Sequence, residues 1–245
     1  TTQLETSTPN TTKHQTLNMA PTQKSVFLGA LLCGASTAAA APTAFTLKML
    51  VGTGVGDGSV DGPLGVGQNS PSNYAAFFDT RTGDVVLGTG SEEVVRRVSP
   101  AGAISTWLGA YNVPGHVNDI GTSARLNRIW DVTVDPATST YYIADYNNVI
   151  RTSTPGGSVG TWGVTGLSNP TGLDIWGNDL WIADKANARV EVAALADASQ
   201  YTFTVAPILA IKLALTRGGA LYVTGYHTDV VLKYLPPSPA EQVVW

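Results

Sequence analysis

Four segments of this 245-residue chain share one plan, and this internal repetition limits the possible fold more than any other feature. Each segment has an apolar run, a turn, a second run, a polar turn, a third run and a turn rich in proline or glycine, often followed by a fourth run. In the second segment, Trp130, Val132 and Val134 alternate with polar residues, which is the period of a half-buried strand. The four segments are Asn69–Gly109, Leu126–Gly163, Leu167–Val192 and Ile211–Trp245.

Short antiparallel strands in units of about 40 residues are typical of β-propeller blades, whose apolar faces are buried by stacking on neighbouring blades. Trp107, Trp162 and Trp245 each close the fourth run of a unit, where a large ring is expected to pack between blades. The 26 glycines and the 13% of charged residues also favour short strands and tight turns over helices. We therefore predict an all-β β-propeller with about four four-stranded blades, at approximately residues 47–109, 110–163, 164–208 and 209–245.

Two segments resemble NHL repeats. Each has a strand that ends in Asp, then a polar turn containing Asn, then a basic residue: YYIADYNNVIR (141–151) and LWIADKANARV (180–190). The glycine- and acid-rich stretches VGTGVGDGSVDGPLG (51–65) and PGHVNDIGTSARLN (114–127) resemble the loop that precedes the first strand in this family. The resemblance implies a propeller of NHL type.

The first and fourth segments depart from the NHL pattern, with Thr89 and Gly225 where the family has Asp. Six-bladed rings are usual in the family and would need about 240 to 280 residues at this repeat length. The residues from 41 onward supply about four blades. Three arrangements stay open: a truncated six-bladed ring, a small four-bladed ring, and an open array that closes by pairing with another chain.

An apolar, uncharged stretch occupies residues 25–41 (SVFLGALLCGASTAAAA). Met19 lies just upstream and an A-x-A site ends at Ala40, so residues 19–40 are predicted to be a secretory signal peptide. A membrane anchor is the alternative, but the strongly apolar part is too short to span the hydrocarbon core. Residues 1–18 are polar and Thr-rich, and we predict a disordered tail or translated upstream sequence there.

The predicted mature chain, residues 41–245, is a secreted propeller with no membrane span after signal removal. The chain's single cysteine, Cys33, lies in the predicted signal peptide, so disulfides and a cysteine nucleophile are excluded from the mature part. The formal net charge is −4 without a basic stripe, so nucleic acid is not an expected partner.

The most regular polar residues belong to the NHL-like turns. Because the pattern recurs from blade to blade, we interpret these residues as structural: Asp accepts hydrogen bonds from its turn, and Arg covers the neighbouring blade. A ring of carboxylates that holds a cation or a polar ligand is the alternative interpretation. The residues are Asp145, Asn147, Arg151, Asp184, Asn187, Arg189 and, in the last unit, His227.

A second, non-repeating group lies in the longest loop between two units, where His116 and Asp119 are followed by Arg125. Binding sites of propellers usually lie on the loops of one face, so these three residues are the predicted binding site.

These features predict a non-catalytic scaffold without a cofactor that binds an extracellular protein or glycan. The alternative is a calcium-dependent hydrolase that resembles the gluconolactonase-type propellers, which bind one divalent cation in the channel through Glu, Asn and Asp. Its possible oxygen ligands are Asn73, Asp131, Asn169 and Asp174.

Overall fold

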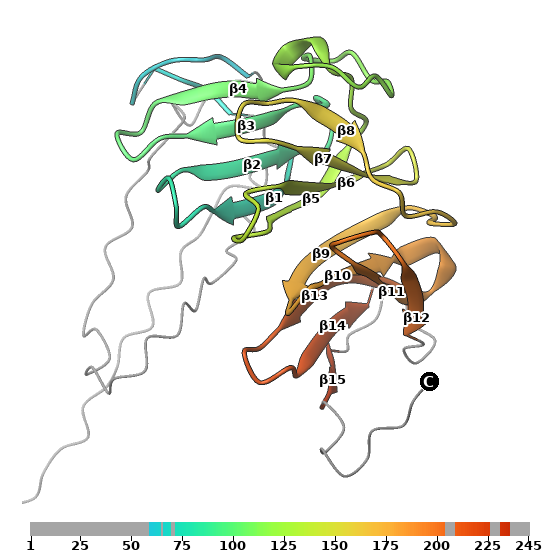
Figure 1. The fold of residues 1–245 in the computed structure, drawn as a ribbon. Helices are drawn as coiled ribbons and strands as arrows, with labels where there is room; N and C mark the ends of the chain where they lie inside the picture. Colours follow the sequence, from blue (N-terminus) through green and yellow to red (C-terminus); the bar gives the residue numbers. More distant parts are fainter. Residues whose placement is uncertain (1–58, 65, 70–71, 204–208, 226–230, 236–245) are drawn as a thin grey trace, which may run out of the picture.

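The computed structural model describes residues 59–64, 66–69, 72–203, 209–225 and 231–235 (Figure 1). The predicted signal peptide, His227 and Trp245 lie outside the described residues. Within them, no helix is long and apolar enough to cross a membrane.

Four antiparallel sheets follow one another along the chain, and in each sheet every strand pairs with the next one in sequence. Blades 1 and 2 occupy the upper half of Figure 1, and blades 3 and 4 the lower half. Blade 1 holds β1 (Asn73–Phe78), β2 (Val85–Thr89), β3 (Val95–Val98) and β4 (Ile104–Leu108). Blade 2 holds β5 (Ile129–Val134), β6 (Tyr141–Asp145), β7 (Val149–Ser153) and β8 (Val159–Thr161).

Blade 3 holds β9 (Pro170–Trp176), β10 (Asp179–Asp184), β11 (Arg189–Ala194) and β12 (Gln200–Phe203). Three strands of blade 4 are described: β13 (Ala210–Leu215), β14 (Leu221–Gly225) and β15 (Val231–Tyr234). Helix is limited to two 3₁₀ turns within the described residues, η1 (Gly121–Ser123) and η2 (Lys185–Asn187). The all-β, four-blade propeller arrangement predicted from the repeats is confirmed.

The second strand of blade 2, β6, is buried on both faces because a blade lies on each side of it. In β6, Tyr141 and Ile143 pack into the cluster between blades 1 and 2, whereas Tyr142 and Ala144 pack into the cluster between blades 2 and 3. A third cluster joins blade 3 to blade 4 through residues such as Val192. Consecutive side chains of a strand point to opposite faces, so one short strand contributes to two cores.

Two of the three tryptophans predicted to close the blades, Trp107 and Trp162, lie at these junctions. Trp107 packs edge-on against Tyr141 of the next blade, with ring centroids 4.7 Å apart. Trp162 packs in the same manner against Tyr142, at 4.9 Å, in the cluster between blades 2 and 3. Aromatic pairs prefer this edge-to-face geometry.

The first strands β1, β5, β9 and β13 contact one another in succession and form the inner side of the array. Each carries a register irregularity at its second residue, which is Tyr74, Trp130, Thr171 and Ile211 in turn. The rings of Tyr74 and Trp130 stack at 4.7 Å across blades 1 and 2. The same register irregularity therefore recurs in the first strand of each blade.

Candidate functional site

A fully buried arginine on the third strand of blade 2 fixes the loop that precedes this blade. The guanidinium of Arg151 donates to the carbonyl oxygens of Arg125 (2.9 Å) and Val117 (3.0 Å) and to Oδ1 of Asn118 (2.6 Å). All three acceptors belong to the loop between blades 1 and 2, residues 110–128, which we call the inter-blade loop. The contacts of Arg151 thus hold a long connection in one conformation.

Asp145 neutralises this arginine from the end of β6. Its Oδ2 lies 3.3 Å from Nη1 of Arg151, and neither side chain is exposed to solvent. Its Oδ1 accepts a hydrogen bond from the backbone N–H of Asn147, two residues later, as in an Asx-turn. Burial raises the pKa of Asp145 to about 6, against the lowering by Asn147 and Arg151. The Asn147 side chain donates to the carbonyl of Gly115 and so also contacts the inter-blade loop.

Blade 1 contains an equivalent arginine that the sequence comparison did not identify. Arg96 pairs with Leu87 in the same register in which Arg151 pairs with Ile143. Arg96 is fully buried and donates to the carbonyl of Gln68 (2.8 Å) and to Asp61 (2.7 Å), in the segment before blade 1. The two adjacent arginines at 96 and 97, in the third apolar run, could have indicated this position. Because Thr89 stands where the NHL pattern has Asp, Arg96 could not be recognised as the equivalent of Arg151.

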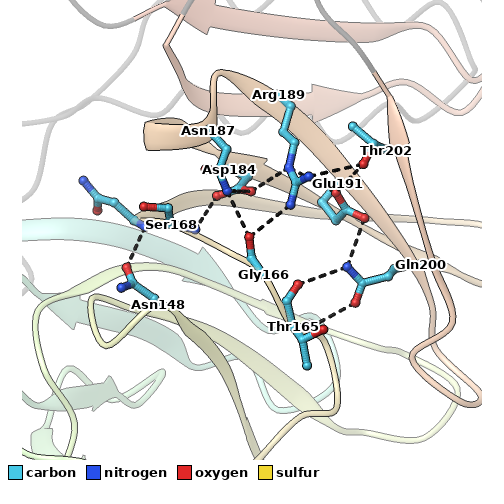
Figure 2. Close-up of polar contacts among 11 residues, drawn as sticks. Asn148, Thr165, Gly166, Ser168, Asp184, Asn187, Arg189, Glu191, Gln200 and Thr202 are labelled. Atoms are coloured by element: carbon cyan, nitrogen blue, oxygen red, sulfur yellow. Dashed lines mark hydrogen bonds and ion pairs between the residues drawn. The ribbon is translucent and has the colours of Figure 1, made fainter.

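Blade 3 has a different residue at this position. Glu191 pairs with Ile182 and therefore takes the place of Arg151, whereas Arg189 lies two residues earlier on the same face. Nε of Arg189 lies 2.8 Å from Asp184 and 3.3 Å from Glu191, and its Nη2 donates to the carbonyl of Gly166. Figure 2 shows Arg189 between the two carboxylates. The two arginines that the sequence places in equivalent positions therefore occupy different positions in their blades.

The remaining contacts of blade 3 tie the connection before it to β10 and to the outer strand β12 (Figure 2). Asp184 accepts from the backbone N–H of Ser168 at 2.6 Å and from the Asn187 side chain at 2.7 Å. Gln200 exchanges two hydrogen bonds with the backbone of Thr165. The hydrogen bonds of the signature residues thus remain within a blade and the segment leading into it, whereas the sequence interpretation placed the arginines over the neighbouring blade.

The inter-blade loop follows the outer edge of blade 2. Val117 bridges to Arg125 within the loop, and Ile120 bridges to Ser158 at the turn before β8. The backbone N–H of Val159 also donates to the carbonyl of Asp119 at 2.8 Å. The loop therefore forms an additional ribbon along β8, at the rim of the molecule.

The three residues predicted as a binding site are spread along this ribbon. His116 lies 2.9 Å from the hydroxyl of Thr161, Asp119 accepts from the N–H of Ile120, and Arg125 donates to the carbonyl oxygens that end η1. Within the described residues no hydrogen bond or ion pair joins one of the three to another. Partial desolvation and the charge of Arg151 lower the pKa of His116.

The outer surface of the inter-blade loop is apolar, which the sequence analysis did not recognise. Four large side chains stand about half exposed on it: Tyr111 (48%), Val113 (45%), Val117 (45%) and Ile120 (63%). The backbone is held at two of them, because the carbonyl of Val117 accepts from Arg151 and Ile120 bridges to Ser158 of blade 2. Val117 and Ile120 are therefore apolar side chains on a fixed part of the loop.

The oxygen atoms of the possible calcium ligands do not form one cluster that is free to bind a cation. Asp131 accepts from the backbone N–H groups of Val132 and Leu173 and forms an ion pair with Lys212 at 2.9 Å. Both oxygens of Asp174 accept backbone N–H groups, at 2.9 and 2.6 Å, and burial raises its pKa.

The two asparagines of this set have different surroundings. Asn73 accepts from the side chain of Asn69 at 2.9 Å. Oδ1 of Asn169 is buried without a hydrogen-bond partner, while its backbone N–H donates to Asn148. In the part of the chain that the structure describes, no three His, Cys, Asp or Glu side chains lie close enough together to hold a metal ion.

The fold is shared with solved β-propellers. An auxiliary nutrient binding protein from Bacteroides thetaiotaomicron matches with a TM-score of 0.60 and 13% identity, over 75% of this chain and 44% of that one. A provisionally assigned gluconolactonase matches with a TM-score of 0.53 and 16% identity, over 67% and 60%. Virginiamycin B lyase from Staphylococcus aureus matches with a TM-score of 0.50 and 15% identity, over 69% and 57%.

These similarities establish the propeller fold. The chain spans between 44% and 60% of the length of these three solved structures. No protein-family model matches the sequence, and no curated protein matches it.

Proposed function

We propose that this chain is a secreted, non-catalytic β-propeller of NHL type that binds an extracellular protein or glycan through the inter-blade loop before blade 2. The observation that carries the proposal is the set of four half-exposed apolar side chains on this loop, two of which, Val117 and Ile120, stand on a fixed backbone. Exposed apolar groups that lie together on a soluble protein mark interaction sites. A loop already held in one conformation loses little entropy when it binds.

The assignment to the NHL type is supported by the second blade, where Asp145, Asn147 and Arg151 act together. The Asp closes the turn, the Asn reaches back to the preceding loop, and the Arg fixes that loop. A motif whose hydrogen bonds hold a blade and the loop that leads into it suits a scaffold.

Binding to arrays of secreted proteins and of glycans tests the proposal, with the full chain and the variant Ile120→Glu. Ile120 is 63% exposed, so a charge there removes apolar contact without disturbing the core. We expect Ile120→Glu to weaken the strongest interaction at least about tenfold. Tyr201→Glu is the matched control, because Tyr201 is 51% exposed on β12. Equal binding by the three proteins contradicts the assignment to the loop.

Removal of divalent cations distinguishes the scaffold from a calcium-dependent lactonase-like enzyme. A scaffold without a cofactor keeps its Tm to within about 1 °C in EDTA. A large calcium-dependent rise in Tm, together with lactone hydrolysis that is lost in Asp131→Ala, favours the enzyme.

A further inference from the structure

A groove with a volume of about 670 Å³ lies between blades 2 and 3, at the end of the strands opposite to Asp145 and Asp184. One wall is the turn between β5 and β6, and the other is the turn between β9 and β10. Asp174 and Phe77, from two inner strands, lie in its lining. The volume is within the range of small-molecule sites.

The wall on blade 2 is rigid because Asp135 organises its turn. The carboxylate accepts from the backbone N–H groups of Ala137 (2.9 Å) and Thr138 (3.2 Å) and from the Thr138 hydroxyl. The opposite wall is fixed by the N–H of Leu195, which donates to the carbonyl of Asn178 at 2.8 Å. The groove is therefore formed before any ligand enters it.

The lining of the groove carries charge of one sign. Asp135 and Asp174 are its acidic residues, and no lysine, arginine or histidine is among the lining residues. Arg81 acts on Asp135 through its charge, and it is already paired with Asp79 at 2.8 Å. Burial opposes ionisation of Asp135, but the hydrogen bonds from Thr138 and Ala137 outweigh it and lower its pKa. Asp135 is thus negative at neutral pH.

The rest of the lining is mainly apolar and aromatic, with Phe77, Tyr142, Ile175 and Leu195. Aromatic rings attract cations, and a carboxylate in a partly desolvated site attracts them more strongly than it does in water. The charge of Asp135 repels an anionic ligand.

We propose that this groove binds a small organic cation, a protonated amine carried on an apolar body. The ammonium group lies toward Asp135, and the body lies against Phe77, Tyr142 and Leu195. This site is separate from the inter-blade loop, and it does not depend on the function proposed for that loop.

Three phenyl-bearing probes of similar size and different charge test the proposal on the full chain: phenethylamine, 2-phenylethanol and 3-phenylpropanoate. We expect calorimetric or NMR titrations to show phenethylamine binding about tenfold more tightly than the alcohol, and the anion most weakly. The proposal is overturned if the amine and the alcohol bind with equal affinity, or if the anion binds more tightly than the amine. It is also overturned if the amine does not bind at 10 mM, which is about the weakest affinity measurable for so small a ligand. Binding of a neutral sugar in preference to the amine also overturns it.

Two variants locate the binding in the groove. Asp135→Asn removes a charge and keeps an acceptor for its turn, and we expect it to weaken phenethylamine at least about fivefold. Asp84→Asn, in the corresponding turn of blade 1, is the matched control and is expected to bind as the unchanged chain does. If the control weakens binding equally, the proposal is wrong.

Ala137→Lys keeps the test decisive if Asp135→Asn does not fold. Ala137 lines the groove with its side chain exposed, so a lysine there adds a cation without removing a core contact. We expect the affinity for phenethylamine to fall at least about tenfold. Unchanged affinity contradicts binding in the groove. Ile120→Glu is expected to leave amine binding unchanged, so this proposal and the one for the loop fail separately.

Discussion

Arg151 and Asp145 are opposite charges held out of contact with water. Removing two charges from water costs several kcal/mol per ion, and the attraction between them offsets that cost only when hydrogen bonds satisfy their remaining atoms. Here the guanidinium is satisfied by loop carbonyl groups and by Asn118. The pair therefore stabilises the molecule only while the inter-blade loop is in place.

Replacing Arg151 by methionine should lower the free energy of unfolding by about 3–5 kcal/mol, because Asp145 then remains buried without its partner. Urea denaturation measures this change. Arg217→Met is the control, because Arg217 is exposed in the turn between β13 and β14, and its effect should lie within about 0.5 kcal/mol. Similar losses in the two variants contradict a role specific to Arg151.

Asp145 gives stability a pH dependence of unusual sign. Burial raises its pKa from 3.8 to about 6 on folding, so its contribution is fully present below pH 4 and is lost as pH rises through 6. Relative to the unchanged chain, Asp145→Asn should therefore gain on the order of 3 kcal/mol between pH 4 and pH 7. Urea denaturation at both pH values checks this, and a difference that does not vary with pH contradicts it.

In each of the first two blades, an arginine on the third strand holds the segment that precedes the blade. The outer strand β8 would leave an unpaired edge, and the inter-blade loop covers part of that edge through its bridge at Ile120. Asn118 joins the two, because its side chain accepts from Arg151 and from the hydroxyl of Thr161 at 3.1 Å.

Asn118→Ala should therefore loosen the loop more than it destabilises the whole molecule. We expect amide exchange at residues 113–126 to accelerate about tenfold, while β6 exchanges as before. Hydrogen–deuterium exchange with mass spectrometry measures both regions. Thr122→Ala, at an exposed position of the same loop, should leave exchange unchanged.

Strand alternation and turn chemistry could be predicted from the sequence, whereas register could not. The turn after Asp145 leads to Val149, and the turn after Asp184 leads to Arg189, with one more residue between the paired ends. Matching the basic residue after each turn therefore paired Arg151 with Arg189, although Glu191 holds the equivalent place. The exposure of the apolar side chains on the inter-blade loop could not be predicted either, because it depends on how the loop lies along β8.

At the scale of the whole molecule, contacts between inner strands join blades that are not neighbours in sequence. Lys212 of blade 4 pairs with Asp131 of blade 2 at 2.9 Å. Between them, a Cβ added to Gly172 of blade 3 would lie only 2.9 Å from the Cα of Lys212. No local pattern reveals this arrangement, since its members lie far apart along the chain.

Gly172→Ala should consequently push blades 3 and 4 apart and destabilise the protein by about 1–3 kcal/mol. Thermal and urea denaturation measure the loss. Gly156→Ala is the matched control, because a Cβ there meets its nearest atom at 3.8 Å, an ordinary contact. A loss as large in the control as in Gly172→Ala contradicts close packing as the cause.

The buried arginine of blade 2 also sets an order of events during synthesis. Arg151 follows Arg125 by 26 residues and Val117 by 34, so the loop leaves the ribosome well before the side chain that fixes it. Until β7 has been made and paired, the exposed peptide bonds around Ile120 are open to proteases. Resistance of this loop to cleavage thus reports that blade 2 is complete.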